Sequence, residues 1–267
     1  MFKQRTITSW LAVGEALAPW RPLAEWPLLI LVGVTGVGKS TTVEALQTAG
    51  LSFTLLPNRR ELTDELIIGQ MQTAAGEAVQ LVTDRIKRFD YTAQYRQKYP
   101  GGMAHALSQL LVLPSELPTA QLIFDGLRGV EEVTYAAELL PRAYFLVLEA
   151  PLVVRVKRLL GRGDAFDKVS SIAQKRAEVG LVGLIPEAAG VFTAEEEAEL
   201  MGLVADGVVS AEDLQGKLKI VLTERANYDP DGAREALLQV GRERVILGDT
   251  VALSPEEIAA LVRDRWV

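Results

Sequence analysis

Short apolar runs separated by longer amphipathic stretches set the pattern of the chain. Five runs are apolar over most of their length and lack the strict apolar–polar alternation of a half-exposed strand. They cover residues 27–33, 51–56, 121–125, 144–150 and 244–248. Strands buried on both faces are typical of a parallel sheet that helices cover on its two sides. The pattern therefore predicts an α/β fold whose sheet is built from these runs.

The stretch between the second and third runs predicts a long helix. Apolar residues recur there at three- and four-residue steps from Ile67 to Ile86. The Pro-Gly-Gly sequence at residues 100–102 is expected to end this helix or the segment that follows it. We expect residues 58–115 as a whole to form a helical segment.

A helical insertion is predicted at residues 164–217, where Ala, Glu and Val are frequent and strand signals are weak. Capping-box spacings predict helix starts at Thr193, Ser210 and Ser254, each followed three residues later by an acidic residue. Gly207 lies between the first two of these starts and indicates a helical hairpin.

The residues before the first run predict a helical extension. Residues 1–26 contain Trp10, Trp20 and Trp26, which are more typical of packing anchors than of a binding site. The rest of the chain, residues 27–267, is expected to form one domain that carries both helical segments.

Composition narrows the chemistry. The net charge of −7 disfavours a general nucleic-acid or anionic-membrane binder, because both need a positive surface. The chain has no cysteine and a single histidine, which disfavours thiolate metal sites, histidine clusters and Cys or Ser-His-Asp catalysis. No apolar run reaches the length of a membrane span and no clean signal peptide is present, so we expect a cytoplasmic protein.

The first run leads into the most specific motif, Gly-Val-Thr-Gly-Val-Gly-Lys-Ser-Thr at residues 33–41. Its glycines allow a tight wrap in which backbone N–H groups point at phosphate oxygens, and the helix that follows adds its positive N-terminal end. Lys39 would neutralise the β- and γ-phosphates, and Ser40 would ligate Mg²⁺. The residues expected to bind the nucleotide are Gly33, Thr35, Gly36, Val37, Gly38, Lys39, Ser40 and Thr41.

The third run ends in Asp125, followed three residues later by Arg128. A carboxylate at the carboxyl end of such a strand can hold Mg²⁺, so Asp125 and Ser40 are the predicted metal ligands. Arg128 would either grip a second phosphoryl group with two hydrogen bonds or lie on the surface, paired with Glu131 or Glu132. The chain lacks an Asp-x-x-Gly motif followed by Asn-Lys-x-Asp, which disfavours a Ras-like GTPase.

Three arginines follow the fourth run. Arg155, Arg158 and Arg162 fall at three- and four-residue steps, so a helix would place them on one face. Guanidinium groups that point the same way suit a triphosphate during transfer, when charge spreads over the equatorial oxygens. A solvated basic face is the alternative. We expect Arg158 and Arg162 to close over the transferring phosphoryl group.

These motifs, in this order, resemble the nucleoside monophosphate kinase superfamily, which includes adenylate kinase-like and dephospho-coenzyme A kinase-like proteins. The Asp-Gly-Leu-Arg sequence at residues 125–128 is similar to the Asp-Gly-x-x-Arg element of the former and closer to the Asp-Gly-Ile-Arg element of the latter. The similarity covers residues 27–60 and 119–165, and residues 248–251 resemble the loop that lines the adenine.

The resemblance implies a three-layer P-loop fold with a five-stranded parallel sheet and helical insertions. It also implies ATP with Mg²⁺, a mobile lid, and transfer of the γ-phosphoryl group to a phosphorylated or hydroxyl acceptor. Two departures leave the acceptor open. Arg128 lies one residue earlier than in adenylate kinases, and residues 164–217 replace a short lid.

The acceptor is predicted to bind the helical segment 58–115, which follows the second run, because this superfamily holds the acceptor phosphate there. Arg59 and Arg60 offer two guanidinium forks for it, and Asp64 could take a proton from an attacking hydroxyl. The alternative is structural, because Asn58 and Glu61 fit a capping box and the motif would then only start a helix.

The segment that follows is basic and aromatic in an otherwise acidic chain. It contains Arg88, a predicted substrate-binding residue, and Tyr91, Tyr95 and Tyr99 at four-residue steps. The tyrosines would either stack on a base or pack their helix onto the core. His105 is expected to pack or to form a hydrogen bond.

Together these features predict an ATP- and Mg²⁺-dependent phosphotransferase of the nucleotide-kinase type that acts on a small, nucleotide-like acceptor. The predicted catalytic residues are Lys39, Asp64, Asp125, Arg128, Arg158 and Arg162. The expected partners are a nucleoside triphosphate and a small-molecule acceptor, whereas nucleic acid is not favoured and a membrane is not expected. The alternatives are a regulatory ATPase or switch, in which nucleotide orders the helical insertion, and a polynucleotide 5′-kinase.

Overall fold

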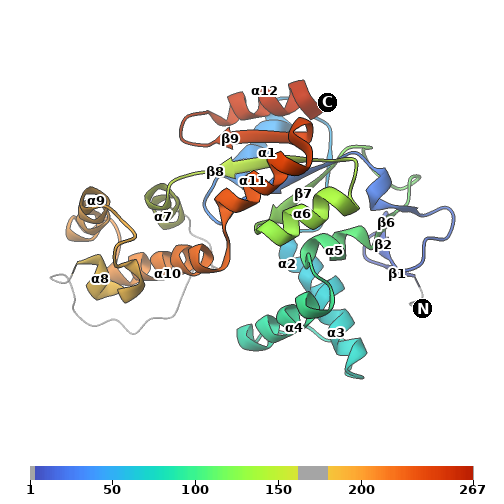
Figure 1. Cartoon of the computed structure of the whole chain (residues 1–267), viewed down its shortest axis with the longest axis horizontal. Helices are drawn as coiled ribbons and strands as arrows, with labels where there is room; N and C mark the ends of the chain where they lie inside the picture. The colour runs from blue at the N-terminus through green and yellow to red at the C-terminus, as the bar shows by residue number, and fades with distance from the viewer. Residues whose placement is uncertain (1–3, 162–179, 267) are drawn as a thin grey trace.

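A parallel sheet of five strands organises the chain in the computed structural model, which describes residues 4–161 and 180–266 (Figure 1). Its strand order is β5-β7-β4-β8-β9, and every pair of neighbours is parallel. The strands are β4 (Leu28–Val32), β5 (Thr54–Leu55), β7 (Leu122–Leu127), β8 (Ala143–Glu149) and β9 (Val245–Asp249). Each overlaps one of the five predicted runs, so the predicted α/β class and parallel sheet are confirmed.

Helices cover both faces of this sheet and give a three-layer fold. One face packs against α1 (Lys39–Thr48) and α12 (Pro255–Trp266), and the other against α5 (Met103–Ser108), α6 (Val130–Leu139) and α11 (Pro230–Gly241). Successive side chains of the central strand β4 enter opposite layers. Leu28, Ile30 and Val32 belong to one core, and Leu29 and Leu31 to the other. This double burial explains why β4 is apolar at every position.

The N-terminal segment is not the predicted helix. It contributes β1 (Arg5–Thr6), β2 (Leu11–Val13), β3 (Arg21–Pro22) and a short 3-10 turn, η1 (Leu23–Glu25). Strands β2 and β3 pair with β6 (Leu110–Val112), and β1 pairs with β2. All pairs in this second sheet are antiparallel. Prolines 19 and 22 remove backbone donors that a continuous helix would need, and the partner strand β6 lies about ninety to a hundred residues away in sequence. Trp10 is buried in the core, as an anchor should be.

The segment between β5 and β6 is helical but is not one long helix. It consists of α2 (Arg59–Leu62), a π-helical stretch η2 (Thr63–Ile68), α3 (Gly69–Ala74), α4 (Arg85–Lys98) and α5. The helix predicted through Ile86 is therefore wrong, because residues 75–84 leave the helical path. Gly76 has φ +74°, and the Gln72 side chain exchanges two hydrogen bonds with the backbone of Gln80. These contacts stabilise a loop that periodicity alone does not reveal.

Helix α7 (Leu152–Leu160) follows β8 and is the first element of a helical module that has its own hydrophobic core. We define the helical module as α7, α8 (Leu181–Leu184), η4 (Pro186–Ala188), α9 (Ala194–Ala205) and α10 (Ala211–Asn227). The predicted insertion is helical where the structure describes it, whereas residues 164–179 lie outside the described residues. Helix α10 continues ten residues beyond the predicted end at 217.

The predicted helix starts in this part of the chain are confirmed. Thr193 forms a capping box, Ser210 caps α10, and Ser254 exchanges hydrogen bonds with Glu257 at the start of α12. Gly207, with φ +70°, makes the turn between α9 and α10. In Figure 1 the module lies to one side of the sheet, opposite the antiparallel strands. Within the described ranges, no helix is both long and apolar enough to cross a membrane.

Candidate functional site

The glycine loop, residues 33–38, connects β4 to α1 at the carboxyl edge of the parallel sheet. Gly33, Gly36 and Gly38 have φ values of 151°, 85° and 102°, which L side chains rarely adopt. A Cβ on Gly33 would also lie 2.9 Å from the carbonyl oxygen of Leu148. Both conformation and space therefore require glycine, and the loop has the tight wrap that the sequence predicts.

Lys39, the first residue of α1, folds back across this loop. Its Nζ donates to the carbonyl oxygens of Gly33 at 3.0 Å and Val34 at 3.3 Å, and lies 3.7 Å from Oδ1 of Asp125. Burial lowers the pKa of Lys39 to about 8, although the Asp125 carboxylate works in the opposite direction. The ammonium group is thus held between the loop and the end of β7.

Asp125 has an oxygen that fits a metal ion. Its Oδ1 is buried and has no hydrogen-bond partner among the described residues. The chain bulges beside it, because Leu31 pairs with Asp125 while Val32 pairs with Leu127, which leaves Gly126 as the extra residue. Ser40 follows Lys39 in the first turn of α1. A carboxylate oxygen and a hydroxyl are ligands that suit Mg²⁺, which usually takes few protein ligands and completes its shell with phosphates and water.

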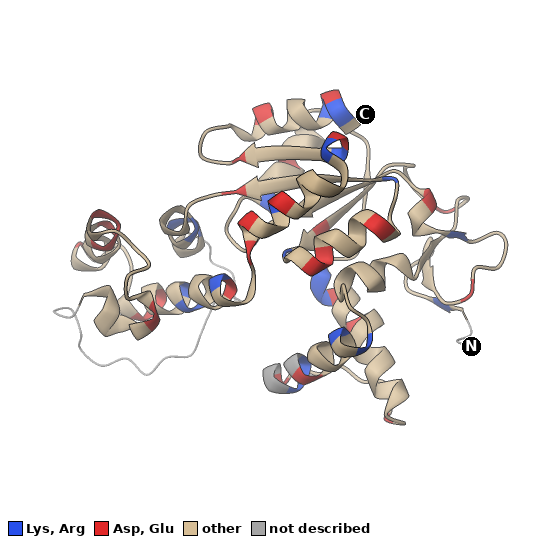
Figure 2. Ribbon diagram, viewed as in Figure 1, with Lys and Arg blue, Asp and Glu red and all other residues tan. Residues whose placement is uncertain are grey.

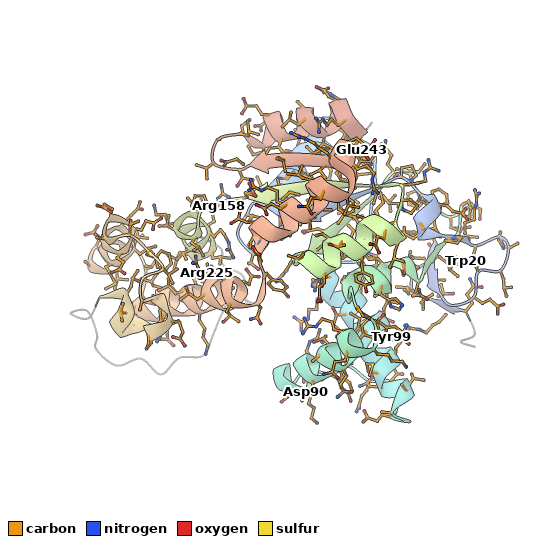
Figure 3. The ribbon with its side chains drawn as sticks, in the orientation of Figure 1. Trp20, Asp90, Tyr99, Arg158, Arg225 and Glu243 are labelled. Carbon is orange, nitrogen blue, oxygen red and sulfur yellow. The ribbon has the colours of Figure 1, made fainter. Side chains whose placement is uncertain are left out.

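Two arginines of α7 reach the glycine loop from the helical module. Arg155 Nε donates to the Thr35 carbonyl oxygen at 2.8 Å, and Arg158 donates to that of Gly36 at 3.3 Å. Arg158 also bonds the side chain and the carbonyl oxygen of Thr250, both at 2.8 Å. Figure 3 shows Arg158 between the module and the sheet. The predicted shared face therefore points at the loop, whereas Arg162 lies outside the described residues.

A residue that the sequence reading missed, Glu224 of α10, joins these groups. Its carboxylate accepts hydrogen bonds from the Thr35 backbone N–H at 2.9 Å and the Thr35 hydroxyl at 2.6 Å. It also pairs with Arg128 and Arg155, each at 2.7 Å. The side chain of Arg128 is thus bound to Glu224 rather than to the surface partners weighed from sequence, and only its backbone N–H donates to Glu132, at 3.2 Å.

One sequence signal could have revealed Glu224. Positions 214, 218 and 221 of α10 are buried leucines and a valine, and Glu224 continues the same helical face. A charged residue on an apolar stripe is expected to have a partner. The identity of that partner could not be read, because Thr35 and Arg128 lie 189 and 96 residues away in sequence.

The predicted acceptor residues lie on α2, η2 and α4. Arg59 binds both carboxylate oxygens of Glu132, at 2.9 and 2.5 Å, and the Gly126 carbonyl oxygen at 2.6 Å. It therefore sits beside Asp125 with its guanidinium engaged. Arg60 is exposed at the start of α2, where Asn58 and Glu61 form the capping box that the sequence allowed.

Asp64 and Arg88 form an ion pair between η2 and α4, and Arg88 also donates to the Val82 carbonyl oxygen at 3.0 Å. Tyr95 is buried and its hydroxyl lies 2.9 Å from Nδ1 of His105. Tyr99 stacks on the His105 ring with a centroid separation of 4.3 Å. Tyr95 and Tyr99 therefore pack α4 onto α5, and the hydrogen bond expected for His105 is confirmed.

A cavity of about 320 Å³ adjoins the glycine loop on its other side. Gly38 and Thr41 line one wall, and Arg158, Leu253 and Ile258 line the rest. Apolar walls with a guanidinium at one edge suit a planar heterocycle. The cavity includes Thr250, which belongs to the residues 248–251 that resemble an adenine-lining loop.

Comparison with known proteins gives distant similarities. No model of a protein family and no curated protein matches the chain. Among solved structures, TT1252 from Thermus thermophilus is 15% identical with a TM-score of 0.39, over 89% of this chain and 94% of that one. A gluconokinase from Sinorhizobium meliloti 1021 is 15% identical with a TM-score of 0.32, over 90% and 94%. A deoxyadenosine kinase from M. mycoides with bound dATP is 13% identical with a TM-score of 0.23, over 89% and 97%.

The arrangement of the strands, the helices and the loop between them identifies the fold. The parallel sheet, the glycine loop between β4 and α1, Asp125 at the end of the neighbouring strand and the arginines of α7 together make a P-loop kinase-like fold.

Proposed function

We propose that the chain is an ATP- and Mg²⁺-dependent phosphotransferase that moves the γ-phosphoryl group to a small, nucleotide-like acceptor bearing a phosphate or a hydroxyl. The observation that carries the proposal is the set of charged side chains at the glycine loop. Lys39, Arg155 and Arg158 donate to its carbonyl oxygens, Asp125 lies beside Lys39, and Arg128 is linked to the loop through Glu224. Cations that surround a phosphate-sized loop suit phosphoryl transfer, in which catalysis consists mainly of positioning and charge stabilisation.

The donor would bind along the glycine loop and α1. Backbone N–H groups of residues 36–41 and the Lys39 ammonium would hold its β- and γ-phosphates, and the positive end of α1 adds to their attraction. The base would enter the cavity lined by Leu253 and Ile258, with Arg158 between the base side and the phosphates. Arg162 would add a further guanidinium from the same helix.

Ser40 and Asp125 would hold the metal. Mg²⁺ would neutralise charge on the phosphate oxygens. Asp125 would also keep Lys39 oriented, since their side chains already lie 3.7 Å apart.

Transfer would proceed by in-line attack of an acceptor oxygen on the γ-phosphorus, with release of ADP. Arg128 would bind the acceptor or the transferring group, and Arg59, Arg60 and Arg88 would line the acceptor side. Arg59 already donates three hydrogen bonds to Glu132 and Gly126, so we assign it the task of fixing the Asp125–Gly126 bulge beside the acceptor. Asp64 would serve a hydroxyl acceptor as proton acceptor once its pair with Arg88 opens.

A nucleotide-dependent switch is the second candidate, and one observation favours it. Arg155 and Glu224 of the helical module contact the glycine loop directly, so nucleotide binding would act on the module. A switch would yield inorganic phosphate or no product, whereas a kinase makes ADP and a phosphorylated acceptor in equal amounts.

An acceptor screen with Lys39→Ala tests the proposal. The wild-type chain is incubated with ATP, Mg²⁺ and pools of nucleosides, nucleotides and sugars, and ADP and new phosphorylated products are measured together. We expect Lys39→Ala to lose at least about a hundredfold in kcat/KM, because it removes the buried cation beside the phosphates. Lys219→Ala, which removes an exposed lysine of α10, is the control. Full activity in Lys39→Ala would refute the mechanism.

A further inference from the structure

The Glu224 carboxylate is held by four donors. Two come from Thr35, its backbone N–H and its hydroxyl, and two from the guanidinium groups of Arg128 and Arg155. Glu224 is 7% exposed and Arg155 is 4% exposed, so the carboxylate and this guanidinium are shielded from water. Each carboxylate oxygen accepts from one arginine and one Thr35 group.

These donors are the kinds that bind phosphoryl oxygens. A backbone N–H of a glycine-rich loop, a hydroxyl and two guanidinium groups form the usual cradle of a tetrahedral oxyanion. Among side chains, a carboxylate is the group that most resembles such an anion. The donors converge on the glycine loop at Thr35, two residues from the start of the motif, whereas Lys39 lies at its other end.

The Glu224 carboxylate leaves no place for a second anion on the same donors. Lys39, Arg128 and Arg155 are balanced in part by Asp125 and Glu224. A phosphoryl group bound by Arg128 and Arg155 would lie against the Glu224 carboxylate, and like charges at that distance repel each other strongly in a site with little water. The carboxylate therefore has to leave before an oxyanion can take the same donors.

The molecule offers a way for Glu224 to leave. Its side chain borders a cavity of about 310 Å³, also lined by Tyr228, Pro230 and Asp249. Glu224 lies one turn from the C-terminal end of α10, and the module that contains α10 has a hydrophobic core distinct from those of the sheet. Rotation of the Glu224 side chain toward this cavity would withdraw the carboxylate from its donors.

Withdrawal would also change how the module holds the loop. Arg155 donates to the Thr35 carbonyl oxygen, Glu224 accepts from the Thr35 N–H, and the two side chains pair with each other. Thr35 is thus gripped on both sides of its backbone by α7 and α10. If the Glu224 contacts were lost, the hydrogen bond from Arg155 to the Thr35 carbonyl oxygen would remain.

We propose that Thr35, Arg128 and Arg155 form an oxyanion site beside the glycine loop, and that Glu224 fills it as an internal substitute until a phosphoryl group displaces it. The inference rests on the proposed function, because the displacing group is either the γ-phosphate of the donor or an anionic group of the acceptor. In both cases, occupation of the site loosens α10 from the loop and reports ligand binding to the helical module.

The test measures ligand affinity in Glu224→Gln, which removes the charge and keeps the size of the side chain. Isothermal titration with ADP, with the non-hydrolysable analogue AMP-PNP, and with inorganic phosphate in the presence of ADP, all with Mg²⁺, covers both sources. We expect about tenfold tighter binding of AMP-PNP but not of ADP if the γ-phosphate displaces Glu224. We expect tighter binding of phosphate to the ADP complex if the acceptor's anion does so.

Glu212→Gln, near the start of α10, is the matched control and should bind all three probes like the wild type. Unchanged or weaker binding of every probe in Glu224→Gln would overturn the inference, and weaker binding would make Glu224 a positioning residue for the arginines. If the wild-type chain and Glu224→Gln both fail to bind AMP-PNP, the proposed function fails. Binding in the wild type that is lost in Lys39→Ala establishes the donor site independently of Glu224.

Amide hydrogen exchange on the wild-type chain gives a second readout that needs no variant. Addition of AMP-PNP or of ADP with phosphate should speed exchange at the C-terminal end of α10 while it slows exchange in the glycine loop. Slower exchange in both segments with every probe would mean that Glu224 stays in place, and would overturn the inference even if Glu224→Gln does not fold.

Discussion

The one histidine of the chain is set in an aromatic cluster rather than in the candidate site. His105 accepts or donates a hydrogen bond with Tyr95 and stacks on Tyr99. Burial lowers the pKa of His105 below its ordinary value of 6.5. The imidazole is therefore neutral at physiological pH and supports the packing of α4 on α5.

A pH titration should reveal this environment. Because the chain contains a single histidine, its imidazole NMR signals are unambiguous and should titrate with a midpoint below 6.5. The folded state binds this proton less readily than the unfolded state, so the group costs stability as the pH falls through 6.5, and the cost is complete below the folded pKa. His105→Gln should lose this part of the pH dependence of thermal unfolding. A midpoint at or above 6.5 would contradict the prediction.

At the scale of single residues, the sequence predicts local motifs but not which charged residues pair across long sequence separations. Lys39, Asp125 and Arg158 follow strands at fixed spacings, and their placement around the loop follows from strand direction alone. The engagement of Arg59 by Glu132 and of Arg128 by Glu224 depends on contacts across 73 and 96 residues. No periodicity carries such information, so the sequence gives the residue type of the site but not which charges are already paired.

At the scale of elements, the Arg59–Glu132 pair fastens α2 to the start of α6. Glu132 is 6% exposed and also accepts from the Arg128 backbone N–H, so it ties the end of β7 to both helices. The bulge at Gly126 lies under this pair, and a Cβ on Gly126 would be 2.9 Å from Arg59 Cβ. The acceptor-side helix is thus attached directly to the strand that carries Asp125.

Removal of the Glu132 carboxylate should therefore destabilise the contact between α2 and α6. We expect Glu132→Ala to lower the free energy of unfolding by about 3 kcal/mol, because it leaves the largely buried Arg59 charge without its carboxylate partner. Glu131→Ala, the exposed neighbour on the same helix, should change it by less than about 0.5 kcal/mol. Urea unfolding followed by circular dichroism measures both. Equal effects of the two variants would mean that the pair contributes little.

Among the elements, strands were predicted better than helices. The inner strands of the parallel sheet, β4, β7 and β8, are buried along most of their length, and this leaves long apolar runs in the sequence. The antiparallel strands β1, β2 and β3 have two or three residues each, too few to show an alternation. The break at Gly76 is held by a side chain to backbone exchange, which a periodicity of apolar residues passes over.

At the scale of the whole molecule, the hydrophobic core is divided. The two layers around the sheet meet across its strands, whereas the helical module buries its own set, which includes Leu159, Leu200 and Leu218. Figure 2 shows both signs of charge distributed over α10 and over α4. The helical module contacts the glycine loop of the sheet domain through the hydrogen bonds of Arg155, Arg158 and Glu224.

This division predicts local unfolding. Leu218 is fully buried in the module, so Leu218→Ala should cost about 2–5 kcal/mol there. Amide hydrogen exchange should then speed up in α8, α9 and α10 while the amides of β4 and β7 keep their rates. Val208→Ala, at an exposed position of the same module, should leave all of these rates unchanged. Equal acceleration in β4 and β7 would show one cooperative unit.

The small antiparallel sheet has a consequence for solubility. Strand β6 is an interior strand, and both of its neighbours, β2 and β3, come from the first 26 residues. A chain that began after Trp26 would leave Leu110, Leu111 and Val112 with unpaired backbone groups on both edges. Apolar strands with bare edges recruit strands from other molecules and start aggregates. The N-terminal strands β2 and β3 therefore occupy both edges of β6 and keep other copies of the protein from pairing with it.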